Sequence, residues 1–406
     1  MKASLEQSSL PCRRFGRTGL SMPVLSLGGM RFQQSWTDLE AEVITSESQQ
    51  LLQDILERAV ACGFHHVETA RHYGSSERQL GWALRDVLDP QRLLQSKVPP
   101  REDPKVFEAE LALSFERLGC ERLDLVAIHG LNLSEHLEQT LRPGGCMDVL
   151  RRWQGDGRIG HVGFSTHGPT DLIVQAIETD AFDYVNLHWY FIYQDNDPAL
   201  DAAARHDLGV FIISPTDKGG HLHSPSSQLL ELCAPLHPIV FNDLFCLQDP
   251  RVHTISVGAA RPSDLDRHLE AVDLLQSAAE LLPPVQQRLV DAAQLALGEA
   301  WWTSWQRGLP PWQESPGEIN LPILLWLHNL VEAWGMEGYA KARYGLLGSG
   351  SHWFPGANAE ALDADVSEAA LREVLVNSPW CDQIPGLLRR LRNRLGGHPQ
   401  QRLTSV

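Results

Sequence analysis

Four side chains that could together transfer a proton stand at or just after the ends of short apolar segments. Glu68 and Tyr73 lie in VETARHYGSSE, Lys97 lies in LLQSKV, and His129 lies in LDLVAIHG. The strands of a parallel barrel bring such ends to one face of the fold, where the chemistry of these barrels is found. A carboxylate, a phenol, an ammonium and an imidazole gathered there would form a proton-transfer site.

The chemistry that suits these residue types is reduction of a carbonyl group. The carbon takes hydride and the oxygen takes a proton, so the site needs an acid whose pKa can approach neutrality. Tyr73 would serve if Lys97 lowered its pKa, since a cation within about 4–6 Å favours the phenolate. Glu68 would hold the ammonium, and His129 would hydrogen-bond the substrate oxygen or relay a proton. The alternative is a structural Glu–Lys pair and a histidine that caps a strand end.

Eight strand-like segments alternate with helical ones between about residues 20 and 275. They are β-branched or aliphatic runs without sustained polar alternation, typical of parallel strands buried on both faces: VLSLGG, FHHVETA, RLLQSKV, LDLVAIHG, RIGHVGFST, FDYVNLHW, GVFIISP and TISVGA. No Gly-rich dinucleotide fingerprint follows the first strand, which favours a closed (β/α)8 TIM barrel over an open α/β sheet. Gly28 and Gly29 predict a tight turn at a strand end, with a weak phosphate loop as the alternative.

The pattern changes after residue 275, where strand candidates disappear and tryptophan-rich helical segments follow. We therefore expect two domains: the barrel over residues 1–275 and a small all-helical C-terminal domain over 276–406. The basic run Arg389, Arg390, Arg392 and Arg394 indicates a solvated helix face, with a partner site as the alternative.

Composition and charge argue against several classes of function. The formal net charge of −17 at pH 7 disfavours a nucleic-acid surface or binding to an anionic membrane. The N-terminal segment lacks the apolar core of a signal peptide, and no apolar run is long enough to span a bilayer. Seven scattered cysteines without a CxxC pair indicate reduced thiols. These features predict a cytoplasmic protein without a metal site.

The segment HVETARHYGSSERQLGWAL resembles the second-strand signature of the aldo/keto reductase family, DTAxxYGxSExxLG. FGRTGLSMPVLSLGGMRF resembles the entry hairpin and first strand of that family, and the resemblance covers most of residues 13–275. It implies a TIM barrel, a small aldehyde or ketone as substrate, and NADP as cofactor with NAD as the alternative. Tyr73 would be the general acid, Lys97 and Glu68 the pair that tunes it, and His129 the orienting residue. Glu68 stands where the family usually has Asp.

The same resemblance implies the cofactor contacts, which are Ser165, Thr166, Asn186, Ser214, Gly258 and Arg261. Ser165 and Thr166 stand for the Ser-Asn pair that holds the nicotinamide amide, and Asn186 stands for the usual Gln. Ile213 takes the place of a stacking aromatic residue. Arg261 is the obvious partner in VGAARPSDL for a 2′-phosphate, because a guanidinium suits phosphate geometry; a plain surface charge is its alternative role.

The tail resembles that of a subgroup of predicted oxidoreductases in this family whose ferredoxin-like C-terminal domain binds a [4Fe–4S] cluster. Trp312 and its neighbours stand where cysteines belong, and Cys381 is alone, whereas such a cluster takes four thiolates. We therefore expect a degenerate domain without an iron–sulfur cluster. The alternative function for the whole chain is a non-catalytic or cofactor-sensing scaffold whose C-terminal domain docks a partner protein.

Overall fold

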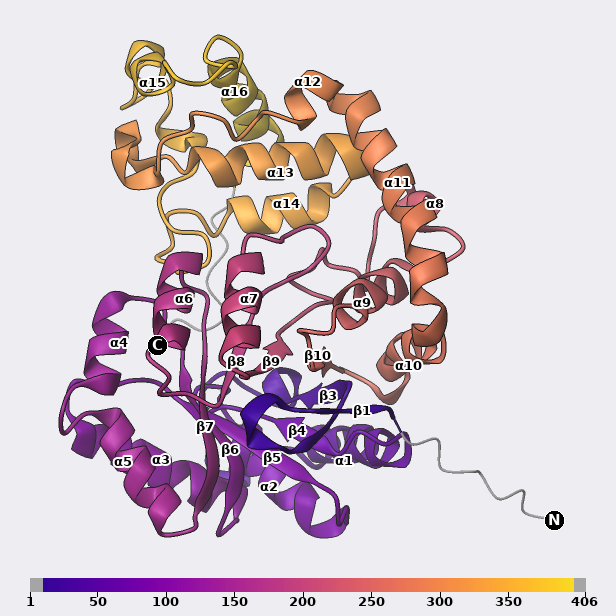
Figure 1. Cartoon of the computed structure of the whole chain (residues 1–406), viewed down its shortest axis with the longest axis vertical. Coiled ribbons are helices and arrows are strands. Elements are labelled where there is room, and N and C mark those ends of the chain that lie inside the picture. Colours follow the sequence, from indigo (N-terminus) through magenta and orange to yellow (C-terminus); the bar gives the residue numbers. More distant parts are fainter. Residues whose placement is uncertain (1–9, 398–406) are drawn as a thin grey trace. The chain divides into compact units, whose positions relative to one another are not determined.

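The computed structural model describes residues 10–397. Eight parallel strands close into a barrel in the order β10-β3-β4-β5-β6-β7-β8-β9, which confirms the predicted (β/α)8 fold (Figure 1). Each strand falls in one of the predicted segments: β3 (Leu25–Gly28), β4 (His66–Glu68), β5 (Leu93–Val98), β6 (Leu123–His129), β7 (Ile159–Ser165), β8 (Tyr184–Leu187), β9 (Gly209–Ile212) and β10 (Thr254–Gly258).

Helices follow most of the strands and lie outside the barrel (Figure 1). They are α1 (Ser46–Ala61), α2 (Ser76–Asp86), α3 (Pro104–Leu118), α4 (Ser134–Leu141), α5 (Cys146–Gly155), α6 (Thr170–Glu178), α7 (Asp197–Arg205), α9 (Pro238–Gln248) and α10 (Asp266–Asp273). Local sequence sets their ends. In α3 the Asp103 carboxylate caps the Lys105 amide, Pro104 occupies the first turn, and Gly119 ends the helix at φ 62°.

An N-terminal hairpin packs against the amino ends of the strands. Its strands, β1 (Cys12–Arg14) and β2 (Ser21–Pro23), pair antiparallel. Phe15 is fully buried against Tyr184, with the two ring centroids 5.6 Å apart, and it lies in a cluster with Met22 and Phe211. A side chain at Gly209, the first residue of β9, would collide with the Phe15 ring. The hairpin therefore closes this end of the barrel, and the predicted site residues lie at the opposite end.

The chain forms two compact units. The first comprises the residues through Gly219 together with Asn242–Ala278, and the second comprises Gly220–Phe241 together with the residues from Ala279 onward. Two of the three boundaries fall inside helices, in α9 and in α11 (Ala278–Leu297), and the excursion at 220–241 contains α8 (Ser227–Cys233). That the two units are separate domains stays a prediction.

The second unit is helical, as predicted, and its residues 279–397 contain no β-strand. Its other helices are α12 (Glu299–Trp302), α13 (Leu321–Trp334), α14 (Glu337–Tyr344), α15 (Glu368–Val374) and α16 (Ile384–Leu395). Tryptophans pack its interior: Trp301 lies 5.2 Å from Trp380 between ring centroids and donates its Nε1–H to Asn329. Ser226 in the excursion donates its hydroxyl to the Trp334 carbonyl, which ties 220–241 to α13.

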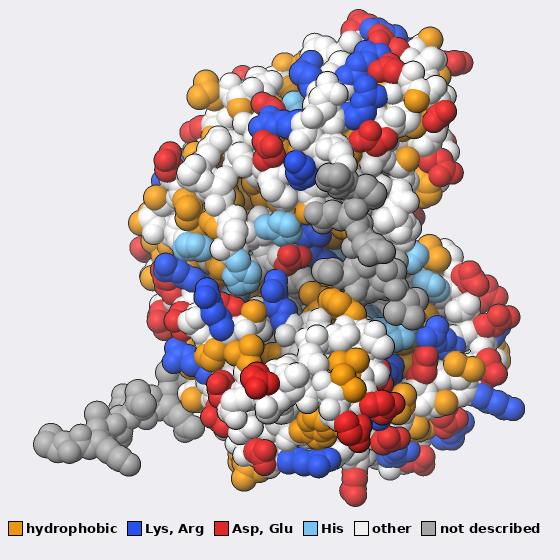
Figure 2. All heavy atoms as spheres, turned by 180° about the vertical axis from the view of Figure 1, so that it is seen from behind, with side chains coloured by type: hydrophobic (Ala, Val, Ile, Leu, Met, Phe, Trp, Pro, Cys, Tyr) orange, Lys and Arg blue, Asp and Glu red, His pale blue; other side chains and the backbone are white. Residues whose placement is uncertain are grey.

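The basic run on α16 is part of an ion-pair network inside the helical unit. Arg389 pairs with Asp363 and Glu368, and Arg394 pairs with Glu332 and Glu337. On the face of the protein drawn in Figure 2, basic side chains likewise lie beside acidic ones. These contacts fit the predicted solvated helix face, and a partner for this surface stays a hypothesis.

Within residues 10–397, no single helix is both long enough and apolar enough to cross a bilayer. The two helices α8 and α9, joined at a bend of 52°, meet the length and composition criteria only when they are taken together.

Candidate active site

Glu68 and Lys97 form a buried ion pair at the carboxyl ends of β4 and β5. The strand register sets Glu68 beside Gln95, so that Lys97 projects from the same side of β5 one layer higher. The Lys97 ammonium donates hydrogen bonds to Glu68 Oε2 and, at 2.8 Å, to the Thr69 carbonyl. The two residues are only 4% and 1% exposed. Removing either partner of such a buried ion pair would destabilise the fold, because the remaining charge would be buried without compensation.

Tyr73 lies between this pair and His129. Its hydroxyl is 3.5 Å from Lys97 Nζ, and the ammonium is 4.8 Å from the centre of the phenol ring. The His129 ring meets the Tyr73 ring edge to face, with centroids 5.6 Å apart and planes at 87°. The four residues singled out from the sequence thus meet at one end of the barrel.

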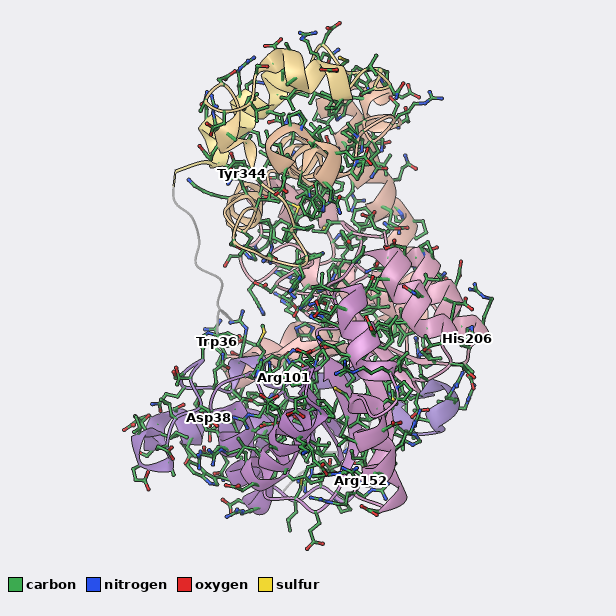
Figure 3. All side chains as sticks on the ribbon, turned by 90° about the vertical axis from the view of Figure 1, so that its left-hand side faces the viewer. Trp36, Asp38, Arg101, Arg152, His206 and Tyr344 are labelled. Atoms are coloured by element: carbon green, nitrogen blue, oxygen red, sulfur yellow. The ribbon has the colours of Figure 1, made fainter. Side chains whose placement is uncertain are left out.

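The turn that carries Tyr73 is braced by two other residues of the same motif. Arg71 donates to Glu77 at the start of α2 and, at 2.5 Å, to Asp38, which is labelled in Figure 3. Glu77 is 1% exposed and also accepts a hydrogen bond of 2.6 Å from the Ser96 hydroxyl. The charged residues of ARHYGSSE therefore fix the loop between β4 and α2, and with it the position of the phenol.

The electrostatics keep Tyr73 protonated at neutral pH. Burial raises the pKa of Tyr73 and Lys97 lowers it, and the net direction is upward. This differs from the expected lowering, because the phenol is desolvated and Glu68 offsets part of the Lys97 charge. For Lys97, burial lowers the pKa but Glu68 and Tyr73 raise it to a net increase, so the ammonium stays charged. Burial, followed by the Lys97 charge, lowers the pKa of His129 well below its usual value, which leaves a neutral imidazole.

Two of the expected nicotinamide contacts are adjacent on neighbouring strands. Ser165 ends β7 and is in register with Asn186 of β8. Asn186 is fully buried, and neither its amide nitrogen nor its amide oxygen has a hydrogen-bond partner among the described residues. Because leaving such atoms unsatisfied is costly, they fit a ligand that offers both a donor and an acceptor, as a carboxamide does. The residues present therefore fit the nicotinamide group.

The remaining expected cofactor contacts differ in how available they are. The Thr166 hydroxyl donates to the Leu131 carbonyl at 2.7 Å and accepts from the Gly168 amide at 2.9 Å, so it joins the loop after β7 to the loop after β6. Ser214 follows β9 with φ at 51°, in the left-handed region that a serine rarely adopts. Gly258 ends β10 in register with Gly28 of β3.

Arg261 lies at the surface after β10, and its contact with a cofactor phosphate stays a prediction. Its side chain is 75% exposed and pairs with Asp264 at 2.9 Å. Sequence reasoning missed Arg31, an exposed residue in the turn after β3 that has no ion-pair partner among residues 10–397. The Arg31 side chain passes 3.6 Å from the point where a Cβ on Gly258 would lie, which places this guanidinium beside the end of β10. The sequence did offer one signal for Arg31: it stands two residues after Gly29, in the predicted turn at the end of the first strand.

A chain of hydrogen bonds lies beyond β7 and β8, and the sequence did not indicate that its residues meet. His167 Nδ1 bonds to His188 Nε2, and His188 Nδ1 bonds to the Tyr190 hydroxyl at 2.6 Å. The Lys218 ammonium lies 3.4 Å from the ring nitrogens of His167. These polar residues come from the loops that follow β7, β8 and β9, so the sequence could show them only one by one.

No group of three or more His, Cys, Asp or Glu side chains that could hold a metal ion occurs in the described part of the chain. Cys381 donates its thiol to the Arg372 carbonyl at 3.5 Å. The loss of the iron–sulfur cluster stays a prediction.

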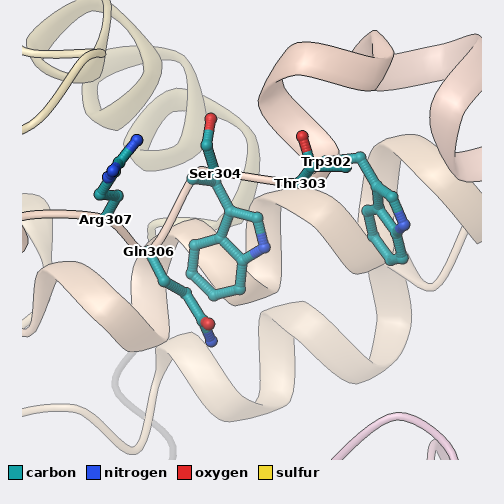
Figure 4. A pocket seen from close by; sticks show the side chains of 6 residues that line it. Trp302, Thr303, Ser304, Gln306 and Arg307 are labelled. Carbon is teal, nitrogen blue, oxygen red and sulfur yellow. The ribbon is translucent and has the colours of Figure 1, made fainter.

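The helical unit contains a pocket of about 290 Å³ next to α12 (Figure 4). Its lining combines two indoles with a guanidinium and polar side chains: Trp302, Thr303, Ser304, Trp305, Gln306 and Arg307. Its lining includes no carboxylate or imidazole, so it lacks two of the group types that the barrel site combines.

Comparison with known proteins shows which family the barrel sequence matches. Residues 24–224 match the sequence model of the aldo/keto reductase family. Two Escherichia coli proteins named L-glyceraldehyde 3-phosphate reductase, from O157:H7 and from K12, are 23% and 22% identical over 340 residues, which span 69% of this chain and 92% of theirs.

Solved structures show the same fold. An aldo-keto reductase from Pseudomonas aeruginosa superposes with a TM-score of 0.52 at 22% identity, over 69% of this chain and 99% of its own. One from Bacillus halodurans, in its holo form, gives a TM-score of 0.55 at 16% identity, over 68% and 97% of the two chains.

Proposed function

The chain carries an aldo/keto reductase domain and is an oxidoreductase, and from that premise we propose that it reduces an aldehyde or a ketone to an alcohol. The observation that most supports this proposal is the position of Tyr73, whose hydroxyl is 3.5 Å from the buried Lys97 ammonium. A protonated phenol beside a fixed cation is a proton donor whose anion is stabilised as it forms.

In the proposed reaction each of the four residues has one task. When bound, the reduced nicotinamide supplies hydride to the carbonyl carbon. Tyr73 donates its hydroxyl proton to the carbonyl oxygen, and Lys97 stabilises the phenolate that results. Neutral His129 hydrogen-bonds the same oxygen and orients the carbonyl group. Glu68 keeps Lys97 charged and in place, because a buried ammonium without a counterion tends to lose its proton.

For the cofactor, the unsatisfied amide of Asn186 and the neighbouring Ser165 would hold the carboxamide. We propose NADP as the preferred cofactor and NAD as the alternative. Arg31 lies beside the end of β10 and Arg261 follows that strand, and Arg31 is the better placed because Arg261 already pairs with Asp264.

The substrate class is a small carbonyl compound. Since two relatives are named L-glyceraldehyde 3-phosphate reductase, the first compounds to screen are short aldehydes with and without a phosphate group. The cytoplasmic location expected from the sequence remains part of the proposal.

The test is a titration with NADPH and then NADH, followed by nicotinamide fluorescence, and a turnover assay over the aldehyde panel. We expect saturable binding of NADPH, tighter than that of NADH, and consumption of the bound cofactor with at least one aldehyde. Arg31→Ala should weaken NADPH binding more than Arg261→Ala does. Binding without turnover of any carbonyl would instead favour a cofactor-sensing scaffold.

A further inference from the structure

Glu68 is one methylene longer than the Asp that the family usually has, so its carboxylate needs both room and an anchor. The room comes from Gly28, which lies in register with Glu68 on the adjacent strand β3. A Cβ on Gly28 would lie 3.3 Å from Glu68 Oε1 and 2.6 Å from the Ser256 hydroxyl oxygen. Any side chain at position 28 would therefore displace Ser256, the carboxylate, or both.

The anchor comes from the other neighbour of β3. Ser256 on β10 donates its hydroxyl to Glu68 Oε1 at 3.3 Å, while Glu68 Oε2 accepts from Lys97. Ser256 is 7% exposed, so water competes little for this contact. The hydroxyl occupies the volume that Gly28 leaves empty, and each carboxylate oxygen has its own donor.

We propose that Ser256 and Gly28 are positioning residues: the Ser256 hydroxyl, seated in the space left by Gly28, fixes the longer Glu68 side chain so that Lys97 stays beside Tyr73. The inference rests on the proposed function, since it names residues that set up that reaction. In the proposed reaction both residues act through Glu68 and Lys97.

The physical reason is the extra rotatable bond of Glu compared with Asp. Without the Ser256 hydroxyl, Oε1 becomes a buried acceptor without a partner, which favours rotation of the carboxylate toward other donors. Because Lys97 is bonded to the same carboxylate, its ammonium moves as well. Tyr73 then loses part of the charge that lowers its pKa and stabilises its anion.

The experiment compares Ser256→Ala with the intact enzyme. We expect kcat to fall about tenfold, equal to about 1.4 kcal/mol of transition-state stabilisation, with KM and the Kd for NADPH unchanged. A second measurement does not depend on turnover: the tyrosinate absorbance of Tyr73, taken as the difference from Tyr73→Phe during a pH titration. We expect this signal to appear at higher pH in Ser256→Ala.

A compensating pair of substitutions tests whether Ser256 positions the Glu68 carboxylate or only fills space in the barrel. Gly28→Ser combined with Ser256→Gly moves the hydroxyl from β10 to β3, within reach of the same Glu68 oxygen, and should restore most of the lost kcat. Ser26→Ala is the matched control, since its buried hydroxyl bonds to His66 and Thr254 and not to Glu68. It should lower stability without shifting the Tyr73 titration.

Unchanged kcat and an unchanged Tyr73 titration in Ser256→Ala would overturn the inference, as would the same titration shift in Ser26→Ala. If no carbonyl compound is turned over by the intact protein, the proposed function fails, but the Tyr73 titration still decides whether Ser256 acts through Glu68 and Lys97.

Discussion

At the scale of single residues, the properties of Tyr73 come from its neighbours and not from its type. Burial alone would hold the phenol neutral, and the Lys97 charge is placed to stabilise its anion. The group is therefore in the donor form at rest, with a cation ready for the phenolate. Such an arrangement suits reduction better than oxidation at neutral pH, where oxidation needs the tyrosine as a base.

Replacing Tyr73 with Phe removes the proton donor and leaves the ring. We expect kcat for carbonyl reduction to fall by roughly 10²-fold or more, in the range for loss of general acid catalysis. NADPH affinity should stay nearly intact. Steady-state kinetics together with fluorescence titration check both. Tyr344→Phe, which removes a hydroxyl bonded to Glu360 in the helical unit, is the control and should keep full activity.

The reduction rate should be flat across neutral pH. His129 has a pKa well below 6.5 and is neutral above that pH, while Tyr73 has a pKa above 10.0 and stays protonated below it. Lys97, with its pKa raised above 10.5, stays charged over the same range. Loss of the Tyr73 proton should therefore slow reduction only above pH 10.0. A pH profile of kcat that descends between neutrality and that value would contradict the assignment of Tyr73.

At the scale of the elements, polar side chains inside the barrel join strands that are distant in sequence. The Ser26 hydroxyl bonds to His66 Nδ1 at 2.6 Å and to the Thr254 hydroxyl at 2.7 Å, which links β3, β4 and β10. All three side chains are fully buried. This layer lies directly beneath Gly28, Glu68 and Ser256, two residues back along each strand.

This polar layer predicts acid sensitivity of the fold. Burial, with a smaller contribution from Lys97, lowers the pKa of His66 from 6.5 to about 3. Its stabilising contribution is fully present above pH 6.5 and is lost as pH falls toward 3, at about 1.4 kcal/mol per pH unit. The free energy of unfolding should therefore fall more steeply below pH 6.5 in the natural protein than in His66→Gln. Denaturant melts at neutral and mildly acidic pH test this, and equal slopes would show that His66 titrates normally.

At the scale of the whole molecule, the helical unit bears on where the barrel obtains its electrons. Tryptophans pack its interior, and partly exposed ion pairs lie at its surface. Cys381 is the single cysteine of residues 276–406, so four thiolates are not present there, and its thiol bonds to a backbone carbonyl. The barrel would then depend on a diffusible nicotinamide cofactor for its electrons.

We therefore expect the purified protein to contain no stoichiometric iron or acid-labile sulfide. The reason is that a [4Fe–4S] cluster is held by four cysteine thiolates, and the tail offers only Cys381. Metal and sulfide analysis after anaerobic purification gives the answer, with a known ferredoxin as the positive control. A cluster bound in proportion to protein would show that ligands of another kind serve here.

The sequence by itself determined the eight strands and their order. It also singled out Glu68, Tyr73, Lys97 and His129, whose proton-transfer role stays a proposal. Apolar runs that suit parallel strands are local signals, and a residue at the end of such a run must lie at one face of a parallel barrel. The helical character of the tail was likewise visible, because it follows from periodicity along the chain.

Only the tertiary structure decided what surrounds those residues. Ser256 and Glu68 are 188 residues apart in the chain, and barrel closure between β10 and β3 brings them together. Packing also set the net direction of the shift in the Tyr73 pKa, which depends on burial as well as on Lys97. Packing also left Asn186 with a buried amide that has no hydrogen-bond partner among the described residues. Desolvation and long-range neighbours arise from packing, and no local pattern encodes them.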